Sequence, residues 1–278
     1  MGPAVAGNNE PISENVKIFY SNDESDSVAV PSNVYEYFQS IENGRFPFFN
    51  NTHVHVSAMR NLNGETLLIT ASRLGHAEIV ARLVADIDVE ETDNDGWTAL
   101  LNAAHHGHAA VARALLTAGA SVDNPDLVMI QLIYLFSGFF RYCVFCLGRG
   151  FTEVARLLLA SGAQVNTSDK FGSTALIWAA RKGFRQIVEQ LLNSGAELDA
   201  VGMYGSTALM LATRGNHAHV VEMLLSRDPN VNVVDYNGLS ALGIASREDV
   251  LLALLDKKPN LELKNRDGET ALIRAVGF

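Results

Sequence analysis

The sequence predicts an all-α solenoid of tandem repeats, each a short hairpin loop followed by two antiparallel helices. Two observations and one physical argument support this prediction. Two neighbouring segments that begin at Gly172 and Gly205 share the glycine, the string S-T-A-L and a later V-E-x-L-L. Their spacing of 33 residues recurs from Gly205 to Gly238. One such segment cannot bury its apolar face alone, so about three or more must stack to be stable.

Each part of the repeat has a physical role. Thr174 and Thr207 stand just before apolar runs, where a hydroxyl can cap a helix N-terminus. Gly183 is expected to end the first helix, because a turn there favours positive φ, and Asn216, the next most tolerant residue type, follows at the same place. The second helix ends at Gly195 and carries an apolar stripe at helical spacing, formed by Ile187, Val188, Leu191 and Leu192.

A period near 33 residues with the pattern T-A-L-x-x-A resembles the ankyrin repeat. The resemblance covers about residues 34–278 and implies a non-catalytic array that binds other proteins through its concave groove. Narrower strings such as TSDKFGSTALIWAARKG resemble the N-terminal array of the kinase D-interacting, ankyrin-repeat-rich membrane-spanning scaffold family. That resemblance implies a signalling scaffold whose partners are receptor cytoplasmic segments or a kinase. The alternative is the regulatory ankyrin array of a larger enzyme.

The repeats set the expected domain organisation. Residues 1–32, rich in Asn, Ser, Asp, Glu and Gly, are predicted to form a disordered tail, and 33–278 the repeat domain. Residues 33–63 are expected to be a degenerate first repeat, with a helix from about Val34 that places Tyr35, Phe38 and Ile41 on one side. Further repeats are predicted to begin at Gly64, Gly96, residue 139, Gly172, Gly205, Gly238 and Gly268.

The last two repeats depart from the pattern. The one from Gly238 is three residues short at the turn between its helices, where we expect a strained or fused helix pair. The one from Gly268 stops after one helix, so we expect the chain to be part of a longer protein. The membrane-spanning region of the scaffold family would then lie beyond this chain.

The pattern also breaks between Gly96 and Gly172, an interval of 76 residues. We predict an insertion at 124–138 followed by the disrupted repeat from 139. Residues 127–147 carry one charge, Arg141, which makes this stretch a weak candidate for a membrane span. A span would separate two halves of one solenoid, so a poorly adapted helix pair or non-native coding sequence is favoured.

Composition narrows the function further. The net charge of −10 argues against a nucleic-acid partner, and two cysteines without a signal peptide indicate a cytoplasmic protein. No phosphate-binding loop or nucleophile-elbow motif occurs, so neither catalysis nor a cofactor is predicted. Cys143 and Cys146 form a single C-x-x-C without further ligands, so no zinc site is predicted. His108, like His76 and His217, falls in the interhelical turn, where hydrogen bonding within the turn is expected.

Partner contacts are expected at the hairpin tips and on the concave side of the first helices. By their place in the repeat these residues are Asn94, Asp95, Trp97, His105, His106, Lys170, Phe171, Ser173, Arg181, Lys182, Met203, Tyr204, Ser206, Arg214, Tyr236 and Asn237. The set contains aromatic and arginine residues, which are common interface anchors. Arg181, Lys182 and Arg214 form a candidate basic patch for an acidic or phosphorylated segment. Trp178 is expected to pack inside the array, whereas Trp97 is as suited to contact as to packing.

Overall fold

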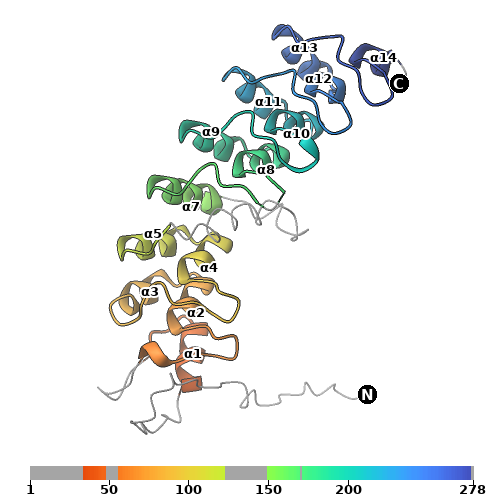
Figure 1. The fold of residues 1–278 in the computed structure, drawn as a ribbon. Helices are drawn as coiled ribbons and strands as arrows, with labels where there is room; N and C mark the ends of the chain where they lie inside the picture. The colour runs from red at the N-terminus through yellow and green to blue at the C-terminus, as the bar shows by residue number, and fades with distance from the viewer. Residues whose placement is uncertain (1–33, 48–55, 123–148, 170, 277–278) are drawn as a thin grey trace, which may run out of the picture. The chain divides into compact units, whose positions relative to one another are not determined.

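The computed structural model describes residues 34–47, 56–122, 149–169 and 171–276. The chain forms two compact parts, Met1–Ala120 and Ser121–Phe278. We refer to the described helices of the first part as the N-terminal stack and to those of the second part as the C-terminal stack (Figure 1).

The N-terminal stack is built from pairs of helices in two rows. First helices contact first helices, α1 with α2 and α2 with α4, and the second helices α3 and α5 contact each other. The elements are α1 (Val34–Glu42), the 3-10 helix η1 (Val56–Ala58), α2 (Leu67–Leu74), α3 (Ala77–Leu83), α4 (Ala99–His105) and α5 (Ala109–Thr117). The predicted helix at Val34 is confirmed, but Tyr37 is buried with Phe38 and Ile41, whereas Tyr35 is only half-buried.

The C-terminal stack repeats the same arrangement. The first helices α8, α10, α12 and α14 form one row and the second helices α7, α9, α11 and α13 form the other (Figure 1). Their bounds are α7 (Arg149–Ala160), α8 (Ala175–Lys182), α9 (Arg185–Asn193), η3 (Met203–Gly205), α10 (Ala208–Arg214), α11 (Ala218–Leu225), α12 (Ala241–Ile244), α13 (Glu248–Asp256) and α14 (Ala271–Val276). The described residues hold no strand beyond isolated bridges in hairpins, so the fold is all-α as predicted.

Local signals set the helix ends. The Thr174 hydroxyl accepts the Ile177 N–H at 3.5 Å, and the Thr207 hydroxyl accepts the Met210 N–H at 3.3 Å. Both predicted caps are therefore confirmed. Gly183 has φ 76° and Asn216 has φ 56°, which confirms the predicted left-handed turn between the two helices. The predicted stripe of the second helix is buried along α9.

The hairpin loops follow one hydrogen-bonding scheme. In each described hairpin, the residue three positions before the loop glycine donates its N–H to the carbonyl four residues further on. That residue is Asn61, Asp93, Asp169, Gly202, Asp235 or Asn265. Its side chain, where present, also accepts turn N–H groups, as the Asp169 Oδ1 does from Ser173 at 2.9 Å.

Neighbouring hairpins are joined by backbone hydrogen bonds. In the N-terminal stack Asn94 N–H donates to the Asn63 carbonyl at 3.0 Å. In the C-terminal stack Tyr236 N–H donates to the Tyr204 carbonyl at 2.9 Å, and Arg266 N–H donates to the Asn237 carbonyl at 2.9 Å. The loops of each stack therefore lie side by side along one edge.

The shortened repeat corrects one prediction. The helix α12 has 4 residues where α10 of the preceding repeat has 7, and Ala245 then adopts extended backbone at φ −60°, ψ 130°. The next helix starts anew at Glu248. The expected fused or strained pair is wrong, because the three missing residues are removed from the first helix and the turn keeps ordinary dihedral angles.

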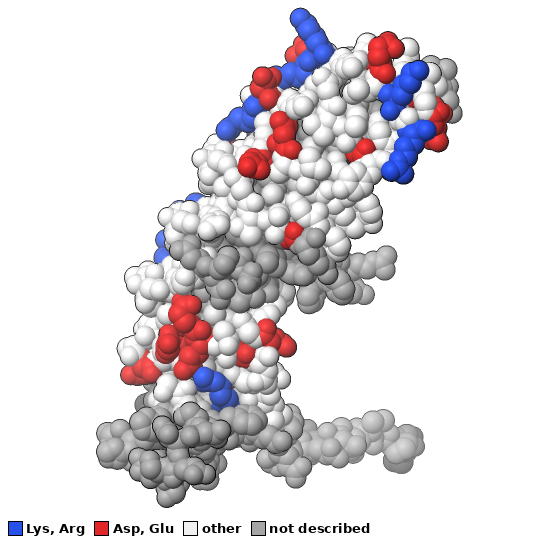
Figure 2. Space-filling view, viewed as in Figure 1, with Lys and Arg blue, Asp and Glu red and all other residues white. Residues whose placement is uncertain are grey.

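Several predicted features lie outside the described residues. These are the tail at 1–32, the insertion at 124–138, the start of the disrupted repeat at 139, the membrane-span candidate at 127–147, Cys143, Cys146 and Lys170. Among the helices that the structure describes, none combines the length and apolar character needed to cross a bilayer. In the view of Figure 2, acidic side chains gather over the N-terminal stack, and acidic and basic side chains mix over the end of the C-terminal stack.

Candidate functional site

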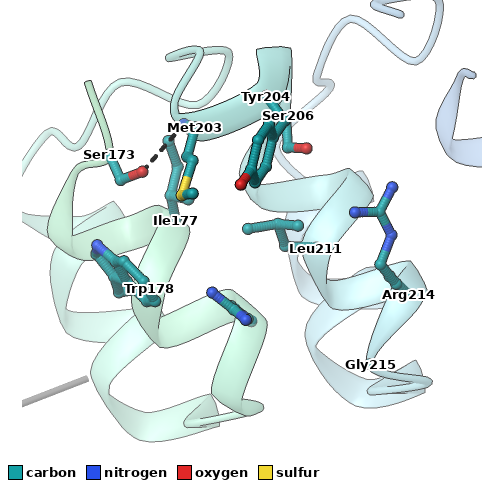
Figure 3. A pocket seen from close by; sticks show the side chains of 10 residues that line it. Ser173, Ile177, Trp178, Met203, Tyr204, Ser206, Leu211, Arg214 and Gly215 are labelled. Carbon is teal, nitrogen blue, oxygen red and sulfur yellow. Dashed lines mark hydrogen bonds between the residues drawn. The ribbon is translucent and has the colours of Figure 1, made fainter. Parts of the chain in front are cut away.

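A groove of about 510 Å³ lies between α8 and α10, and we call it the α8–α10 groove (Figure 3). It contains six of the residues that the sequence singled out as partner contacts. The lining residues are Ser173, Ile177, Trp178, Arg181, Met203, Tyr204, Ser206, Leu211, Arg214 and Gly215. The repeat therefore brings together side chains from two first helices and the hairpin that connects their repeats.

One wall is a fixed aromatic ring with a cation against it. Trp178 is 6% exposed, and its indole N–H donates to Asp169 Oδ2 at 3.2 Å. The Arg181 guanidinium lies 5.1 Å from the centroid of the Trp178 ring, a distance at which a cation is attracted by the π face. Packing was correctly predicted for Trp178, but the ring also borders the groove.

The floor is apolar, and the rim comes from the loop. Ile177 is buried and Leu211 is half-buried. The loop residue Tyr204 is 63% exposed with φ 62°, and its hydroxyl points into the space between the two helices (Figure 3). Ser173 is buried and its Oγ accepts the Met203 N–H at 3.2 Å, so it fixes this loop instead of facing solvent.

The second cation of the groove is already paired. Arg214 Nη2 donates to Asp235 Oδ2 at 3.2 Å, and the two side chains are 48% and 2% exposed. The other oxygen of Asp235 accepts the N–H groups of Asn237 and Leu239 at 2.8 and 3.0 Å. Among the described residues, no Asp or Glu lies within ion-pair distance of Arg181. The charge of Arg214 is therefore compensated by Asp235, whereas no described carboxylate compensates that of Arg181.

The third member of the predicted basic patch lies elsewhere. Lys182 does not line the groove. Burial, and after it the charge of Arg181, lowers the pKa of Lys182. The groove therefore contains Arg181 and Arg214 as its basic side chains.

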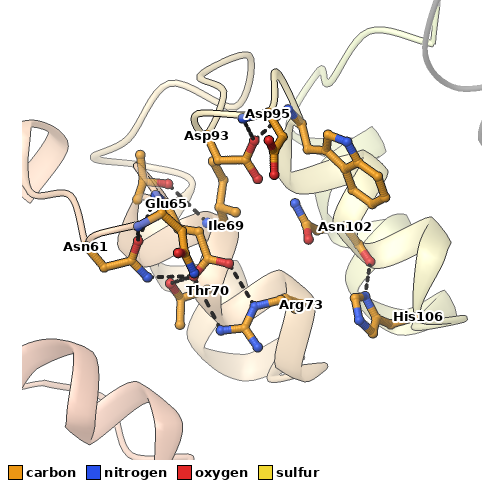
Figure 4. Close-up of polar contacts among 12 residues, drawn as sticks. Asn61, Glu65, Ile69, Thr70, Arg73, Asp93, Asp95, Asn102 and His106 are labelled. Atoms are coloured by element: carbon orange, nitrogen blue, oxygen red, sulfur yellow. Dashed lines mark hydrogen bonds and ion pairs between the residues drawn. The ribbon is translucent and has the colours of Figure 1, made fainter. Parts of the chain in front are cut away.

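The equivalent arginine of the N-terminal stack is also paired. Arg73, like Arg181 and Arg214, is the seventh residue of its first helix. Its Nε donates to Glu65 Oε1 at 2.9 Å, and the same buried carboxylate accepts from Asn61 and Thr70 (Figure 4). This site is therefore closed by the chain's own side chains.

The remaining predicted contacts of the N-terminal stack lie around Trp97. Its half-buried ring contacts the His105 ring edge-on, with the ring centroids 5.0 Å apart. His106 is exposed, and its Nδ1 lies 2.9 Å from the Asn102 carbonyl oxygen (Figure 4). Asn94 and Asp95 are exposed on the adjoining hairpin, where Asn94 Nδ2 donates to the Leu62 carbonyl.

The turn histidines reach across repeats. His108 Nε2 lies 3.0 Å from the Arg73 carbonyl oxygen, and His217 Nε2 lies 3.1 Å from that of Arg181. The prediction of hydrogen bonding within the turn is therefore wrong, because the partner belongs to the preceding repeat. Burial lowers the pKa of His108, although the Arg73 carbonyl opposes the shift. The described residues contain no group of three or more side chains suited to a metal ion.

The remaining predicted residues of the C-terminal stack are exposed on its hairpins or buried, and one residue that matters here was not predicted. Phe171, Tyr236 and Asn237 are exposed on neighbouring hairpins of the C-terminal stack. Ser206 is buried, and its hydroxyl has no hydrogen-bond partner among the described residues. The sequence reasoning missed Asp235, although an Asp or Asn three residues before most loop glycines was the signal that could have indicated it.

A model of the family described as "Ankyrin repeats (3 copies)" matches residues 38–126 and 142–235, more than half of the chain. The chain belongs to the ankyrin-repeat family. The human ASB11 ankyrin repeat domain superposes with a TM-score of 0.61 at 24% identity, over 76% of this chain and 92% of that one. At this identity the likeness shows the ankyrin fold alone.

Two curated proteins match shorter stretches. The mouse "Ankyrin repeat and SAM domain-containing protein 6" is 32% identical over 99 residues, which cover 28% of this chain and 11% of that protein. The "Glycerophosphocholine phosphodiesterase gde1" of Schizosaccharomyces pombe is 40% identical over 80 residues, which cover 28% of this chain and 7% of that protein. The matches thus span about a tenth or less of these relatives.

Proposed function

We propose that this chain is a non-catalytic protein-recognition module whose partner binds the α8–α10 groove. The observation that carries the proposal is the combination of Trp178, Tyr204 and Arg181 around an apolar floor. Large aromatic and arginine side chains dominate the binding energy of protein interfaces, because they bury much area around a specific polar contact. A segment lying along the hairpins would also meet Phe171 and Tyr236, both exposed. The ankyrin-repeat family generally serves protein–protein interaction, which supports this reading.

The N-terminal stack offers a second contact surface in this proposal. Trp97, His105 and His106 form a group of aromatic rings beside the exposed Asn94 and Asp95. Repeat arrays bind partners along extended surfaces, and this group is proposed as a contact surface of the N-terminal stack by itself.

We further propose a role as a cytoplasmic signalling scaffold or adaptor. The support is the resemblance of residues 167–183 to the kinase D-interacting scaffold family, which points to a receptor cytoplasmic segment or a kinase as partner. The net charge of −10 favours a protein partner over a nucleic acid. Association with a membrane would come from regions that this family carries outside its array.

A second candidate is the regulatory ankyrin array of an enzyme. The similarity to part of a glycerophosphocholine phosphodiesterase favours it. Assaying the purified chain for hydrolysis of glycerophosphocholine tests whether the array itself is catalytic, and turnover would contradict the main proposal. Sequencing the full-length transcript separates the candidates, since encoded membrane spans would favour the scaffold and an encoded catalytic domain would favour the enzyme.

The main proposal is tested by paired variants and quantitative affinity capture. The double variant Arg181→Glu with Tyr204→Ala is expected to lose the specific partners while keeping its melting temperature, because both side chains are exposed. The matched control, Arg185→Glu with Leu252→Ala, changes exposed residues of α9 and α13 and should keep them. Identical capture profiles for wild type and both variants would contradict the proposal.

A further inference from the structure

The Arg214–Asp235 pair joins the seventh residue of a first helix to the hairpin of the next repeat. Asp235 stands three residues before the loop glycine Gly238, and it receives Arg214 from the first helix of the preceding repeat, 21 residues earlier. Its carboxylate is thereby shared between the N–H groups of its own hairpin and one guanidinium.

One repeat earlier the same two positions hold Gly202 and Arg181, again 21 residues apart. The backbone at Gly202 keeps the scheme, since its N–H donates to the Ser206 carbonyl at 3.0 Å and its carbonyl accepts the Gly205 N–H at 3.0 Å. The corresponding distances at Asp235 are 2.9 and 2.8 Å. The hairpin at Gly202 therefore has the same backbone hydrogen bonds as the hairpin at Asp235. The difference is that Gly202 has no side chain that could pair with Arg181.

The side chains of Ser173 and Ile177 occupy part of the space that a side chain at position 202 would need. A Cβ atom on Gly202 would lie 2.6 Å from Ser173 Oγ and 3.0 Å from Ile177 Cδ1. Ser173 Oγ instead accepts the Met203 N–H. Arg181 rests on the Trp178 ring and faces the α8–α10 groove. Ser206 also borders this groove, and its buried hydroxyl has no partner in the described part of the chain.

We propose that the α8–α10 groove binds a side-chain carboxylate of an extended partner segment, with Arg181 donating to it as Arg214 donates to Asp235. An apolar side chain next to that Asp or Glu would lie on Ile177 and Leu211. This inference rests on the proposed function and specifies the partner's chemistry. Since Asp235 already compensates Arg214, the groove offers one guanidinium, that of Arg181, without a carboxylate partner among the residues that the structure describes. One such cation suits the single charge of a carboxylate better than the nearly double charge of a phosphate.

The test begins with a random peptide display library selected against the full chain. Peptides eluted from it are expected to share an Asp or Glu beside an apolar residue. Replacing that residue in a synthetic peptide by Asn or Gln, or making Arg181→Gln, should each weaken binding about tenfold or more, as for a charge-assisted hydrogen bond. The two changes together should weaken it little more than either alone, because they remove the same contact.

A variant pair supplies the missing group from within the chain. Gly202→Asp with Ser173→Ala places a carboxylate near Arg181, whereas Gly202→Asn with Ser173→Ala adds the same shape without the charge. Asn is compatible with this hairpin position, which it occupies at Asn61 and Asn265. We expect the Asp version to bind the acidic peptides about tenfold or more weakly than the Asn version. Circular dichroism checks that both are folded.

The outcomes separate the two proposals. Peptides that require the groove residue Tyr204 but show no preference for Asp or Glu would overturn this inference and leave the proposed function intact. If a synthetic peptide binds only when phosphoserine stands in place of the Asp or Glu, the partner group is a phosphate and the carboxylate proposal is overturned. No selectable peptide, or binding indifferent to every groove variant, would overturn both proposals.

Discussion

Arg214 and Asp235 join two successive ankyrin repeats through an N–O contact of 3.2 Å. The carboxylate is 2% exposed and also accepts two N–H groups of its own hairpin, so one buried group fixes both the loop and the neighbouring helix. Repeat arrays gain much of their stability from such interfaces between neighbours.

Asp235→Ala is therefore expected to lower the free energy of unfolding by about 1–3 kcal/mol, because it leaves hairpin N–H groups without their acceptor. Asp235→Asn should cost less, since an amide oxygen can accept the same bonds. Arg214→Gln should change stability by only about 0–1 kcal/mol, because the guanidinium is half-exposed. Urea denaturation measures all three, and equal losses for Ala and Asn would contradict the role given to the hairpin bonds.

The helix caps give a second prediction. Thr174→Ala and Thr207→Ala each remove the side-chain oxygen that accepts a first-turn N–H. Each change should destabilise the array by about 1 kcal/mol. Thr→Ser at the same positions keeps the hydroxyl and should recover most of the loss. Thermal denaturation followed by circular dichroism compares the pairs, and Ser variants as unstable as the Ala variants would refute the capping explanation.

The glycines that follow α8 and α9 allow the cost of backbone strain to be measured apart from the cost of a steric clash. Gly183 has φ 76°, and a Cβ there would lie 2.5 Å from His217 Nδ1. Gly195 has φ 86°, and a Cβ there would have no atom within 4 Å. Alanine at either position is strained by about 1–2 kcal/mol, and Gly183→Ala should cost about 1 kcal/mol more from overpacking. Chemical denaturation decides the point, since equal losses would mean that His217 moves aside without cost.

The turn histidine of the N-terminal stack predicts a dependence on pH. Burial lowers the pKa of His108 below its ordinary value of 6.5, and the neighbouring His106 and His76 lower it further. Because the unfolded chain then binds a proton more readily than the folded one, this contribution to stability is present above pH 6.5 and is lost as the pH falls below it. His108→Gln should remove this part of the slope.

Urea denaturation of wild type and His108→Gln across that range provides the measurement. The difference between their unfolding free energies should change as the pH falls below about 6.5. A difference that stays constant with pH would show that His108 does not titrate between the two states as described.

The sequence was a good guide wherever the determinant is local. The spacing of the loop glycines, the threonine before each apolar run and the Gly183 or Asn216 turn each act within a few residues, and the structure confirms them. Six of the sixteen predicted contact residues also line one groove, because the repeat fixes which helix face lies beside the next.

Contacts between repeats were harder to foresee. The His108 bond to the Arg73 carbonyl joins residues 35 positions apart, and the Arg214–Asp235 pair depends on the register between two repeats. That Gly202 stands where the next repeat has the arginine-pairing Asp235 can be recognised only when that register is known. The fused or strained helix pair predicted for the shortened repeat was wrong, because the deletion shortens α12 and does not strain the turn. The repeat length alone does not distinguish these two possibilities.

The central claim is that the partner lies on the first-helix side of the C-terminal stack, over the α8–α10 groove. Site-specific photo-crosslinking tests it most directly, with a photoreactive phenylalanine derivative placed at Tyr204 or at Glu222, which is exposed on the second helix α11. The account predicts partner adducts at Tyr204 and none at Glu222. Adducts at Glu222 with none at Tyr204 would contradict it.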